Sequence, residues 1–279
     1  MKILSPAKIN LFLHVTGKRP DGYHDLITLM CCIGLYDTVK IDFGLKEISV
    51  TCSDPKVPED ETNLAFKAAR LFYKTLNKPE GVYISIEKNI PVGAGLGGGS
   101  SNAASVLLAL NRYYGFPFSQ DELIAMGLSI GADVPFFIYR KPALVSGIGE
   151  NLKPYERISK FHILLIYPGF SVSTAEVYNN LNLGLTKCQK EFKNQSFMEH
   201  NFDGARHLCN DLETVVESRY PDISVAKKAL LSQGAIGALM SGSGPTVFGI
   251  FSAADKAQRA KQFLSQNDKW RIFLVDMLF

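Results

Sequence analysis

The segment between residues 91 and 105 reads PVGAGLGGGSSNAAS and has the composition of a loop that binds an anion. Glycine lacks a Cβ atom, so the backbone can adopt positive φ angles and its N–H groups can approach a ligand closely. A loop of this kind that opens a helix adds the helix dipole to those donors, and its usual ligand is a phosphate. The alternative interpretation is a flexible linker.

The segments on either side argue against a linker. Residues 82–88, VYISIEK, alternate apolar and polar side chains as a half-buried strand does. Residues 100–114 carry aliphatic residues and alanines in a helical pattern, and Ser100 or Ser101 is expected to cap that helix. The position between a strand and a capped helix therefore favours a phosphate-binding loop.

The common phosphate-binding loops do not fit this segment. Gly93, Gly95 and Gly98 satisfy G-x-G-x-x-G, a pattern shared by dinucleotide-binding folds and protein kinases. A dinucleotide fold needs an acidic residue at the end of a second strand about 20 positions later, but the acidic residues in that range belong to a capping box, Ser119 to Glu122. A Walker A loop needs a Lys-Ser/Thr pair where this loop has Ser-Ser-Asn, and the His-Arg-Asp of protein kinases does not occur.

The loop does resemble the second motif of the GHMP small-molecule kinases, Pro-x-Gly-x-Gly-Leu-Gly followed by a serine pair. Gly98 and Gly99 are inserted before the serines, as in the branch that phosphorylates a cytidine-diphosphate-linked methylerythritol in the non-mevalonate isoprenoid route. Four other segments resemble the family in the right order: SPAKINLFLHVTGKRPDGYH (5–24), GADVPFF (131–137), NDLE (210–213) and MSGSGPTVFGIF (240–251). The resemblance spans nearly the whole chain.

Strands and helices are expected to mix without regular βαβ alternation, which indicates an α+β fold. Strands are predicted over 9–15, 38–43 and 48–52, and a helix over 64–76 that Asn63 could open. The resemblance implies the two-domain GHMP kinase fold with the active site in the cleft between domains. A change of character after Gly149 and a prior of roughly 150 residues per domain place the boundary near 155. We expect an N-terminal ATP-binding domain over 1–155 and a C-terminal domain over 156–279.

Phosphoryl transfer to an alcohol needs a carboxylate that accepts the hydroxyl proton and cationic charge near the transferred group. Asp133 lies in Gly-Ala-Asp-Val-Pro, and the residues alone leave open whether it is a base or a turn or cap residue. Lys8 stands on an apolar strand, where a lysine is more often a solvated edge residue. The resemblance implies that Asp133 is the catalytic base, and that Lys8 orients it and stabilises charge on the transferred group.

The resemblance also implies ATP as phosphoryl donor, carried with Mg²⁺. The expected ATP-binding residues are Pro91, Val92, Gly93, Ala94, Gly95, Leu96, Gly97, Gly98, Gly99, Ser100 and Ser101. Mg²⁺ keeps several waters and relies on substrate phosphates, so no protein metal site is expected, although Ser101 and Asp133 are candidates for a contact. The segment Ser241–Pro245 is expected to form a second glycine turn that faces the active site; the alternative is a simple turn between strands.

Four residues are candidates for substrate binding. Asn10 shares a strand face with Lys8 and can hydrogen-bond a polyol hydroxyl. The resemblance places Tyr23 and His24 along the cytidine and Tyr178 over the pyrimidine. The alternatives are an asparagine in a strand ladder, a packed or surface histidine and a core tyrosine, and the residues alone do not decide between them.

The composition excludes several function classes. The 279 residues include 30 basic and 27 acidic ones without long basic runs, so we expect small-molecule substrates, no nucleic acid and no membrane surface. Pro6 and Lys8 interrupt any apolar signal-peptide core, and the most apolar stretch, 161–170, is too short to span a bilayer. The five cysteines show no C-x-x-C spacing, which favours thiols in a reducing cytoplasm. The protein is expected to be a monomer or a homodimer.

Three other functions share parts of this pattern. Another GHMP kinase, such as a homoserine or mevalonate kinase, and a GHMP decarboxylase are disfavoured by the inserted glycines and by the Gly-Tyr-His segment. A catalytically silent nucleotide-binding regulator is expected to lack the base or the lysine, and this chain has both.

Overall fold

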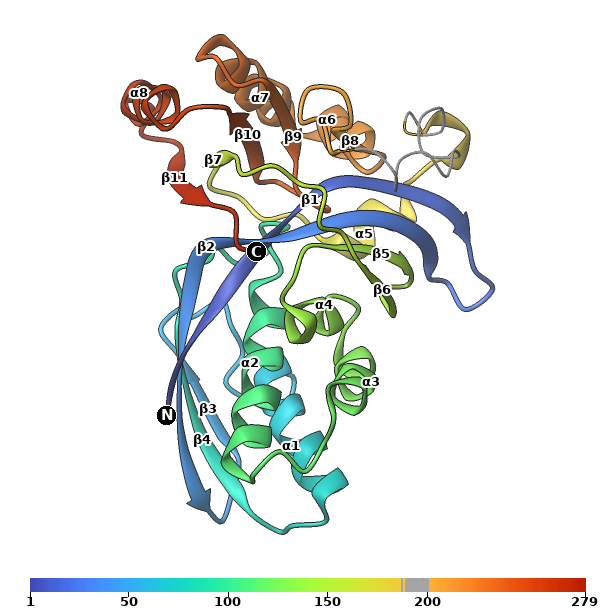
Figure 1. Cartoon of the computed structure of the whole chain (residues 1–279), viewed down its shortest axis with the longest axis vertical. Coiled ribbons are helices and arrows are strands. Elements are labelled where there is room, and N and C mark those ends of the chain that lie inside the picture. The colour runs from blue at the N-terminus through green and yellow to red at the C-terminus, as the bar shows by residue number, and fades with distance from the viewer. Residues whose placement is uncertain (187, 189–200) are drawn as a thin grey trace. The chain divides into compact units, whose positions relative to one another are not determined.

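The computed structural model describes residues 1–186, 188 and 201–279 (Figure 1). The chain forms two compact units, each built from several stretches of sequence. Unit 1 comprises Met1–Ala7, Leu35–Val92 and Gly97–Arg140, and unit 2 comprises Lys8–Gly34, Gly93–Leu96 and Lys141–Phe279. Two long strands, β1 (Lys2–Lys18) and β2 (His24–Leu45), contribute residues to both units. The expected division of the sequence after residue 155 stays a prediction.

Unit 1 places helices against one side of a sheet (Figure 1). The second half of β2 pairs antiparallel with β4 (Gly81–Glu87), and β4 pairs parallel with β3 (Ser49–Cys52). The helices are α1 (Leu64–Leu76), α2 (Gly98–Tyr113), α3 (Gln120–Ile130) and α4 (Val134–Tyr139). The predicted strands at 38–43 and 48–52 and the helix at 64–76 are confirmed, with the first residue of the second strand lying just outside β3.

Local signals explain two of these helix starts. The side chain of Asn63 accepts a hydrogen bond from the Ala65 amide, so Asn63 caps α1 as predicted. Ser119 and Glu122 form the predicted capping box at the start of α3. Both caps satisfy N–H groups that a helix start would otherwise leave without partners.

Unit 2 contains a four-stranded antiparallel sheet in the order β11-β7-β10-β9. Its strands are β7 (His162–Tyr167), β9 (Gly237–Met240), β10 (Val247–Phe251) and β11 (Arg271–Asp276). Helices α7 (Asp222–Ser232) and α8 (Ala254–Leu264) share one hydrophobic core with this sheet. The remaining helical elements are α5 (Thr174–Asn179), η1 (Leu183–Leu185) and α6 (Glu213–Arg219).

The middle of β1 supplies the part of unit 2 that matters for chemistry. The strand predicted over 9–15 is confirmed within β1, and its residues from Ser5 to Val15 are all buried, so both faces are covered. The short strand β8 (Cys209–Asn210) pairs parallel with β1. The first half of β2 pairs with β5 (Ala143–Gly147), which pairs with β6 (Asn151–Pro154). Polar side chains on β1 therefore need partners inside the protein.

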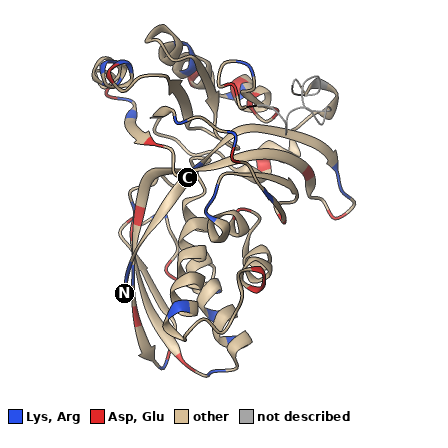
Figure 2. Ribbon diagram, in the orientation of Figure 1, with Lys and Arg blue, Asp and Glu red and all other residues tan. Residues whose placement is uncertain are grey.

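Basic and acidic residues are interspersed along the described parts of both units (Figure 2). Within the same residues, no helix combines the length and the apolar character that crossing a membrane requires.

Candidate active site

The loop between β4 and α2 is held through its carbonyl oxygens. In unit 2, the four consecutive carbonyls from Gly93 to Leu96 each accept a hydrogen bond. The donors, in order, are the amide of Val172 at 3.3 Å, the amide of Thr246 at 3.3 Å, the hydroxyl of Ser241 at 3.0 Å and the amide of Lys8 at 3.0 Å. Since the C=O and N–H of a trans peptide point in opposite directions, the following N–H groups are turned away from these partners. Among the backbone hydrogen bonds of the described residues, none is donated by an N–H from Gly93 to Gly97.

Position 95 requires glycine both because of its backbone conformation and because other backbone atoms lie close to it. Its φ is +74°, and a Cβ at this position would lie 2.1 Å from the carbonyl oxygen of Ser241 and 2.9 Å from the amide of Gly244. Both positions belong to unit 2. A residue with a side chain would push the loop away from the turn at residues 241–244, so the close approach of these two backbones requires glycine.

The start of α2, in unit 1, differs from the prediction. Neither Ser100 nor Ser101 caps the helix: the N-cap is Gly97, with φ +71° and no side chain, and α2 begins at Gly98. The glycine run can enter the helix directly because Gly97 adopts the left-handed conformation without strain. The first-turn N–H groups therefore have no side-chain cap, and they sit at the positive end of the helix dipole. This is the arrangement of an anion site.

Two buried polar atoms in the first turn of α2 point to a ligand. Ser101 is 1% exposed, and neither its hydroxyl oxygen nor the side-chain carbonyl oxygen of Asn102 has a hydrogen-bond partner among the described residues. Leaving such groups unsatisfied costs about 1–3 kcal/mol each. A bound group that hydrogen-bonds or coordinates these oxygens would remove that penalty.

A buried ion pair lies beneath the same helix start, also in unit 1. The ammonium of Lys88 contacts the carboxylate of Asp37, and the other carboxylate oxygen accepts the amides of Asn89 at 2.8 Å and Ile90 at 2.9 Å. A Cβ on Gly98 would lie 2.9 Å from the Lys88 nitrogen, so the cation lies against the first residue of α2. Sequence reasoning missed this pair; the only local signal is a lysine shortly before the glycine loop.

The predicted Lys8 site is assembled on β1 in unit 2. Lys8 is 4% exposed, and its ammonium donates to the side-chain oxygen of Asn10 at 2.6 Å. The Asn10 amide nitrogen donates to the Thr28 hydroxyl at 2.8 Å, which donates to the carbonyl of Phe12 at 2.6 Å. An ammonium can only donate, so this chain of bonds fixes the orientation of the Asn10 amide. The prediction that Lys8 and Asn10 share a strand face is confirmed.

The third motif forms the predicted glycine turn and packs on Lys8. Gly242 has φ +56° and Gly244 φ +77°, and the Gly244 amide donates to the Ser241 carbonyl at 2.9 Å. A Cβ on Gly242 would lie 3.0 Å from the Lys8 nitrogen and 3.2 Å from the Asn10 side-chain oxygen. The hydroxyl of Thr246, just after the turn, is buried and has no partner among the described residues.

Asp133 lies in unit 1 at the N-cap position of α4. It lies in the turn that leads into α4, as one of the two alternatives held, and its side chain makes no capping hydrogen bond. The partnership of Asp133 with Lys8 of unit 2 stays a prediction.

Two of the predicted substrate residues meet in unit 2. The rings of His24 and Tyr178 lie with centroids 5.2 Å apart, and Tyr178 belongs to α5, which Ser173 caps. Burial, and to a smaller extent the charge of Lys18, lowers the pKa of His24, which favours a neutral imidazole able both to donate and to accept. Tyr23 is 59% exposed, so its ring is available to a ligand.

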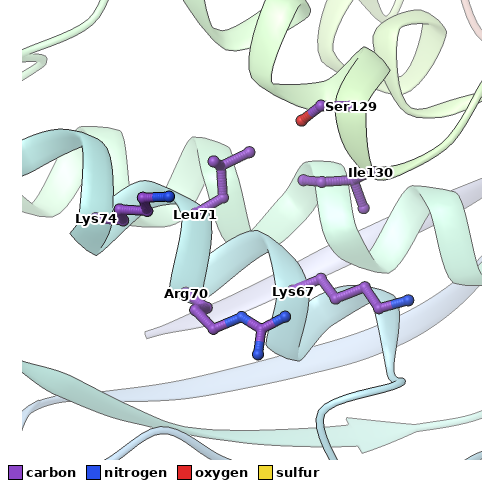
Figure 3. Close-up of a pocket in the computed structure, with 6 residues that line it drawn as sticks. All are labelled: Lys67, Arg70, Leu71, Lys74, Ser129 and Ile130. Atoms are coloured by element: carbon purple, nitrogen blue, oxygen red, sulfur yellow. The ribbon is translucent and has the colours of Figure 1, made fainter.

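A separate pocket of about 440 Å³ lies in unit 1, lined by α1 and the end of α3 (Figure 3). Its lining residues are Lys67, Arg70, Leu71, Lys74, Ser129 and Ile130. None of the residues predicted to bind ATP or substrate lines it.

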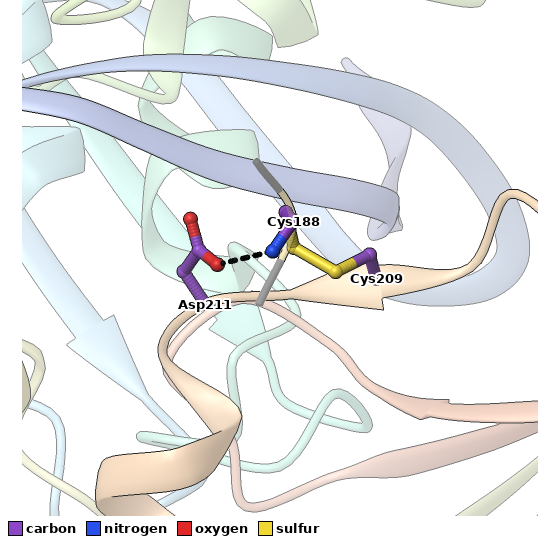
Figure 4. Close-up of side chains that lie close together, drawn as sticks. All are labelled: Cys188, Cys209 and Asp211. Atoms are coloured by element: carbon purple, nitrogen blue, oxygen red, sulfur yellow. Dashed lines mark hydrogen bonds between the residues drawn. A yellow bond between two sulfur atoms is a disulfide. The ribbon is translucent and has the colours of Figure 1, made fainter. Parts of the chain in front are cut away.

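The cysteine prediction is wrong for two of the five residues. Cys188 and Cys209 form a disulfide beside the Asp211 carboxylate, which accepts the Cys188 amide at 3.1 Å (Figure 4). The fold brings them together because Cys209 begins β8, next to β1, a long-range pairing that cysteine spacing does not reveal. Disulfide sulfurs are not thiolate ligands, so this group of three does not make a metal site. Cys31, Cys32 and Cys52 form no disulfide among the described residues.

Comparisons with known proteins agree with the motifs. The GHMP kinase N-terminal domain model matches residues 63–141 and the GHMP kinase C-terminal model matches residues 189–269. The chain is 48% identical over 275 residues to a 4-diphosphocytidyl-2-C-methyl-D-erythritol kinase of Syntrophus aciditrophicus, covering 99% of this chain and 98% of the relative. It is 46% identical to a protein of the same name from Syntrophotalea carbinolica, covering 98% and 97%.

Solved structures extend the likeness to the fold. A crystal structure of 4-(cytidine 5'-diphospho)-2C-methyl-D-erythritol kinase matches with a TM-score of 0.80 and 34% identity over 99% of both chains. The mevalonate kinase of Methanococcus jannaschii matches with a TM-score of 0.75 at 18% identity, covering 100% of this chain and 98% of the other, and shows the fold alone.

Proposed function

Because the chain belongs to the GHMP kinases and, within them, to the 4-diphosphocytidyl-2-C-methyl-D-erythritol kinases, we propose that it transfers the γ-phosphoryl group of ATP to the 2-hydroxyl of 4-diphosphocytidyl-2-C-methyl-D-erythritol. The product is the 2-phosphate, an intermediate of the non-mevalonate isoprenoid route. The enzyme is a small-molecule kinase, and the proposal concerns its substrates and the roles of its residues.

The observation that carries the proposal is the glycine loop. Its carbonyls from Gly93 to Leu96 are bound by the protein, while the N–H groups from Gly93 to Gly97 donate to no backbone carbonyl of the described residues. The uncapped start of α2 continues the same segment with further donors and the partnerless Ser101 hydroxyl. Backbone donors at a helix start suit the oxygens of a triphosphate, and we assign residues 91–101 to ATP.

Mg²⁺ accompanies ATP in this proposal. The buried Ser101 oxygen, which has no partner among the described residues, is a hard oxygen ligand of the kind that Mg²⁺ accepts, so the residues present fit the ion. When bound with ATP, the ion supplies positive charge to the phosphate oxygens. A direct protein contact to the ion is part of the proposal.

The proposed chemistry assigns one role to each catalytic residue. The carboxylate of Asp133 accepts the proton of the 2-hydroxyl, and the hydroxyl oxygen of the substrate forms a bond to the γ-phosphorus. The bond between the γ-phosphorus and the oxygen that bridges the β- and γ-phosphates breaks to leave ADP. The ammonium of Lys8 stabilises the charge on the transferred group. Asn10 holds the Lys8 ammonium and is a candidate for a substrate hydroxyl.

The cytidine is assigned to the aromatic residues of unit 2. His24 and Tyr178 already contact each other, and a neutral imidazole can read both donors and acceptors of a base edge. The exposed ring of Tyr23 can stack on the pyrimidine. A cytoplasmic location and a monomeric or dimeric state remain predictions.

The test is ADP release by the purified protein with Mg²⁺ and ATP, comparing 4-diphosphocytidyl-2-C-methyl-D-erythritol with homoserine, mevalonate and galactose. Turnover confined to the first acceptor and lost in Asp133→Asn and Lys8→Met supports the proposal. Turnover with another acceptor contradicts the substrate assignment. ATP binding without turnover of any acceptor points to the silent regulator.

A further inference from the structure

The segment Asn210–Glu213, which has no role in the proposed chemistry, holds the backbone of the third motif. Asn210 is 5% exposed, and its side-chain nitrogen donates to the carbonyls of Met240 at 2.8 Å and Gly242 at 2.7 Å. Its side-chain oxygen accepts the Leu212 amide at 2.9 Å. The Asn210 side chain therefore uses both its donors on carbonyls of the third motif and its acceptor on its own segment.

Glu213 and Asp211 complete the attachment. Glu213 accepts the Met240 amide at 3.0 Å, so both backbone groups of Met240 are bound by this segment. Asp211 is fully buried and accepts the Val15 amide at 2.9 Å and the His14 imidazole nitrogen at 2.6 Å. The segment thus holds β1, which carries Lys8, and the glycine turn that packs on Lys8.

Gly242 connects Asn210 to Lys8. Its carbonyl is bound by Asn210, and a Cβ at this position would lie 3.0 Å from the Lys8 nitrogen. A small movement of the turn would either press on the ammonium or open a gap beside it. Asn210 thereby determines how closely the turn packs against the lysine and against its partner Asn10.

We propose that Asn210 is a positioning residue for phosphoryl transfer: it acts through the Ser241–Gly244 turn to fix the Lys8 ammonium, without touching substrate. This inference rests on the proposed function only where Lys8 is said to act in catalysis. The coupling between Asn210 and Lys8 is a separate physical claim with its own measurement.

Asn210→Asp is the informative substitution. It keeps the size of the side chain and the acceptor for the Leu212 amide, but it places a carboxylate oxygen against the two carbonyls of Met240 and Gly242. Two attractive contacts become repulsive ones. Asn210→Ala removes the same donors without adding charge and serves where the aspartate variant does not fold.

Asn111 provides a matched control in unit 1. It is also 5% exposed, and its side chain makes two hydrogen bonds to backbone where that of Asn210 makes three: it donates to the Phe118 carbonyl at 2.9 Å and accepts the Phe118 amide at 3.0 Å. Asn111→Ala removes a comparable structural contact in the unit that does not contain Lys8. Any effect of lost stability alone therefore appears in Asn111→Ala as well as in the Asn210 variants.

The kinetic test compares kcat and the KM for ATP in the two Asn210 variants and in Asn111→Ala. We expect kcat to fall about 100-fold in the Asn210 variants with the KM for ATP changed less than about threefold, because misplacement of a catalytic group acts mainly on the chemical step. Asn111→Ala is expected to lower the unfolding midpoint with kcat nearly unchanged. A folded Asn210 variant with kcat near wild type overturns the proposal.

A second readout is independent of turnover. In protein labelled with ¹³C-lysine, the Cε resonance of Lys8, assigned by its loss in Lys8→Arg, should shift in the Asn210 variants and stay in place in Asn111→Ala. If wild type fails to phosphorylate the expected substrate but this resonance shifts, the proposed function is wrong and the positioning claim survives. An unchanged resonance in a folded Asn210 variant contradicts the claim whatever the activity.

Discussion

The two glycine-rich segments are held in opposite ways. The loop from Gly93 to Gly97 is tied through four carbonyls to four separate donors, and its N–H groups bond to no backbone carbonyl of the described residues. The turn from Ser241 to Gly244 is tied through side chains, with Asn210 donating to the Gly242 carbonyl and the hydroxyls of Ser241 and Ser243 bonding to the Gly95 carbonyl and to Thr174, and Gly242 packs against Lys8. The first arrangement prepares backbone donors for a ligand, and the second positions a side chain.

The largest expected effect comes from Gly95→Ala, which touches both segments. The new Cβ would lie 2.1 Å from the Ser241 carbonyl at a residue with φ +74°. We expect the unfolding free energy to fall by about 3 kcal/mol or more, with loss of ATP binding, because strain and a backbone clash add together. Chemical denaturation and ATP titration measure both.

Gly115→Ala is the control for backbone conformation. Gly115 has φ +77°, and a Cβ there meets nothing within 4 Å. The unfolding free energy of Gly115→Ala should fall by only about 1 kcal/mol. If Gly95→Ala is no worse than Gly115→Ala, the two glycine segments do not depend on their close contact.

Gly242→Ala tests the contact of the turn with Lys8. The Cβ would meet the flexible end of Lys8 at 3.0 Å and the Asn10 side-chain oxygen and the Gly95 carbonyl oxygen at 3.2 Å each, so the protein should fold while the ammonium moves. We expect kcat to fall about 100-fold with little change in ATP affinity, since the loop keeps its donors. Gly234→Ala, with φ +89° and open space around its Cβ, is the control expected to retain kcat. Equal kinetics in the two variants would show that the turn does not position Lys8.

Ser101→Ala tests the open side of the glycine loop. Its hydroxyl has no partner among the described residues, so removing it should leave the ATP-free protein as stable as wild type or more so, while ATP binds about tenfold more weakly. Ser105 of the same helix is the control, because it accepts hydrogen bonds from Ser5 at 2.7 Å and Arg140 at 3.3 Å. Ser105→Ala should lower the melting temperature without ATP. Loss of ATP-free stability in Ser101→Ala would mean that the hydroxyl has a structural partner.

The smallest effect concerns Glu213, which accepts the amide of Met240 just before the turn. Burial raises the pKa of Glu213, with Lys227 opposing the shift. The folded protein then binds the proton more tightly than the unfolded chain, so this contribution to stability is present below about pH 4.5 and is lost as the pH rises through the folded pKa. Urea denaturation should show wild type losing stability relative to Glu213→Gln as the pH rises above this value.

Glu122 gives the opposite sign. Hydrogen bonds from the Ser119 amide and hydroxyl lower its pKa, so its contribution is present above its ordinary pKa and is lost as the pH falls through the folded pKa. In urea denaturation, wild type should therefore lose stability relative to Glu122→Gln as the pH falls. The same sign for both variants would contradict the burial of Glu213.

Local signals in the sequence were sufficient for much of the fold and the site. The Asn63 cap, the Ser119 capping box, and Lys8 and Asn10 on one strand face follow from neighbouring residues and strand periodicity. The N-cap at Gly97 was missed because a serine pair is the stronger capping signal, whereas the glycine run allows an uncapped start.

The remaining features depend on contacts between distant residues. Asp37 meets Lys88 across 51 positions, and Asn210 meets Gly242 across 32. The disulfide between Cys188 and Cys209 also depends on where β8 pairs. No periodicity or spacing encodes such pairings, because they arise only when separate strands pack together.

The most direct measurement for the central claim is a ¹H–¹⁵N titration of the protein with Mg²⁺ and a non-hydrolysable ATP analogue. The account predicts that the largest amide shifts fall on Gly95 to Ser101, with smaller ones in the Ser241–Gly244 turn. Unchanged loop amides together with shifts around Lys67, Arg70 and Lys74, in the pocket of Figure 3, would contradict it.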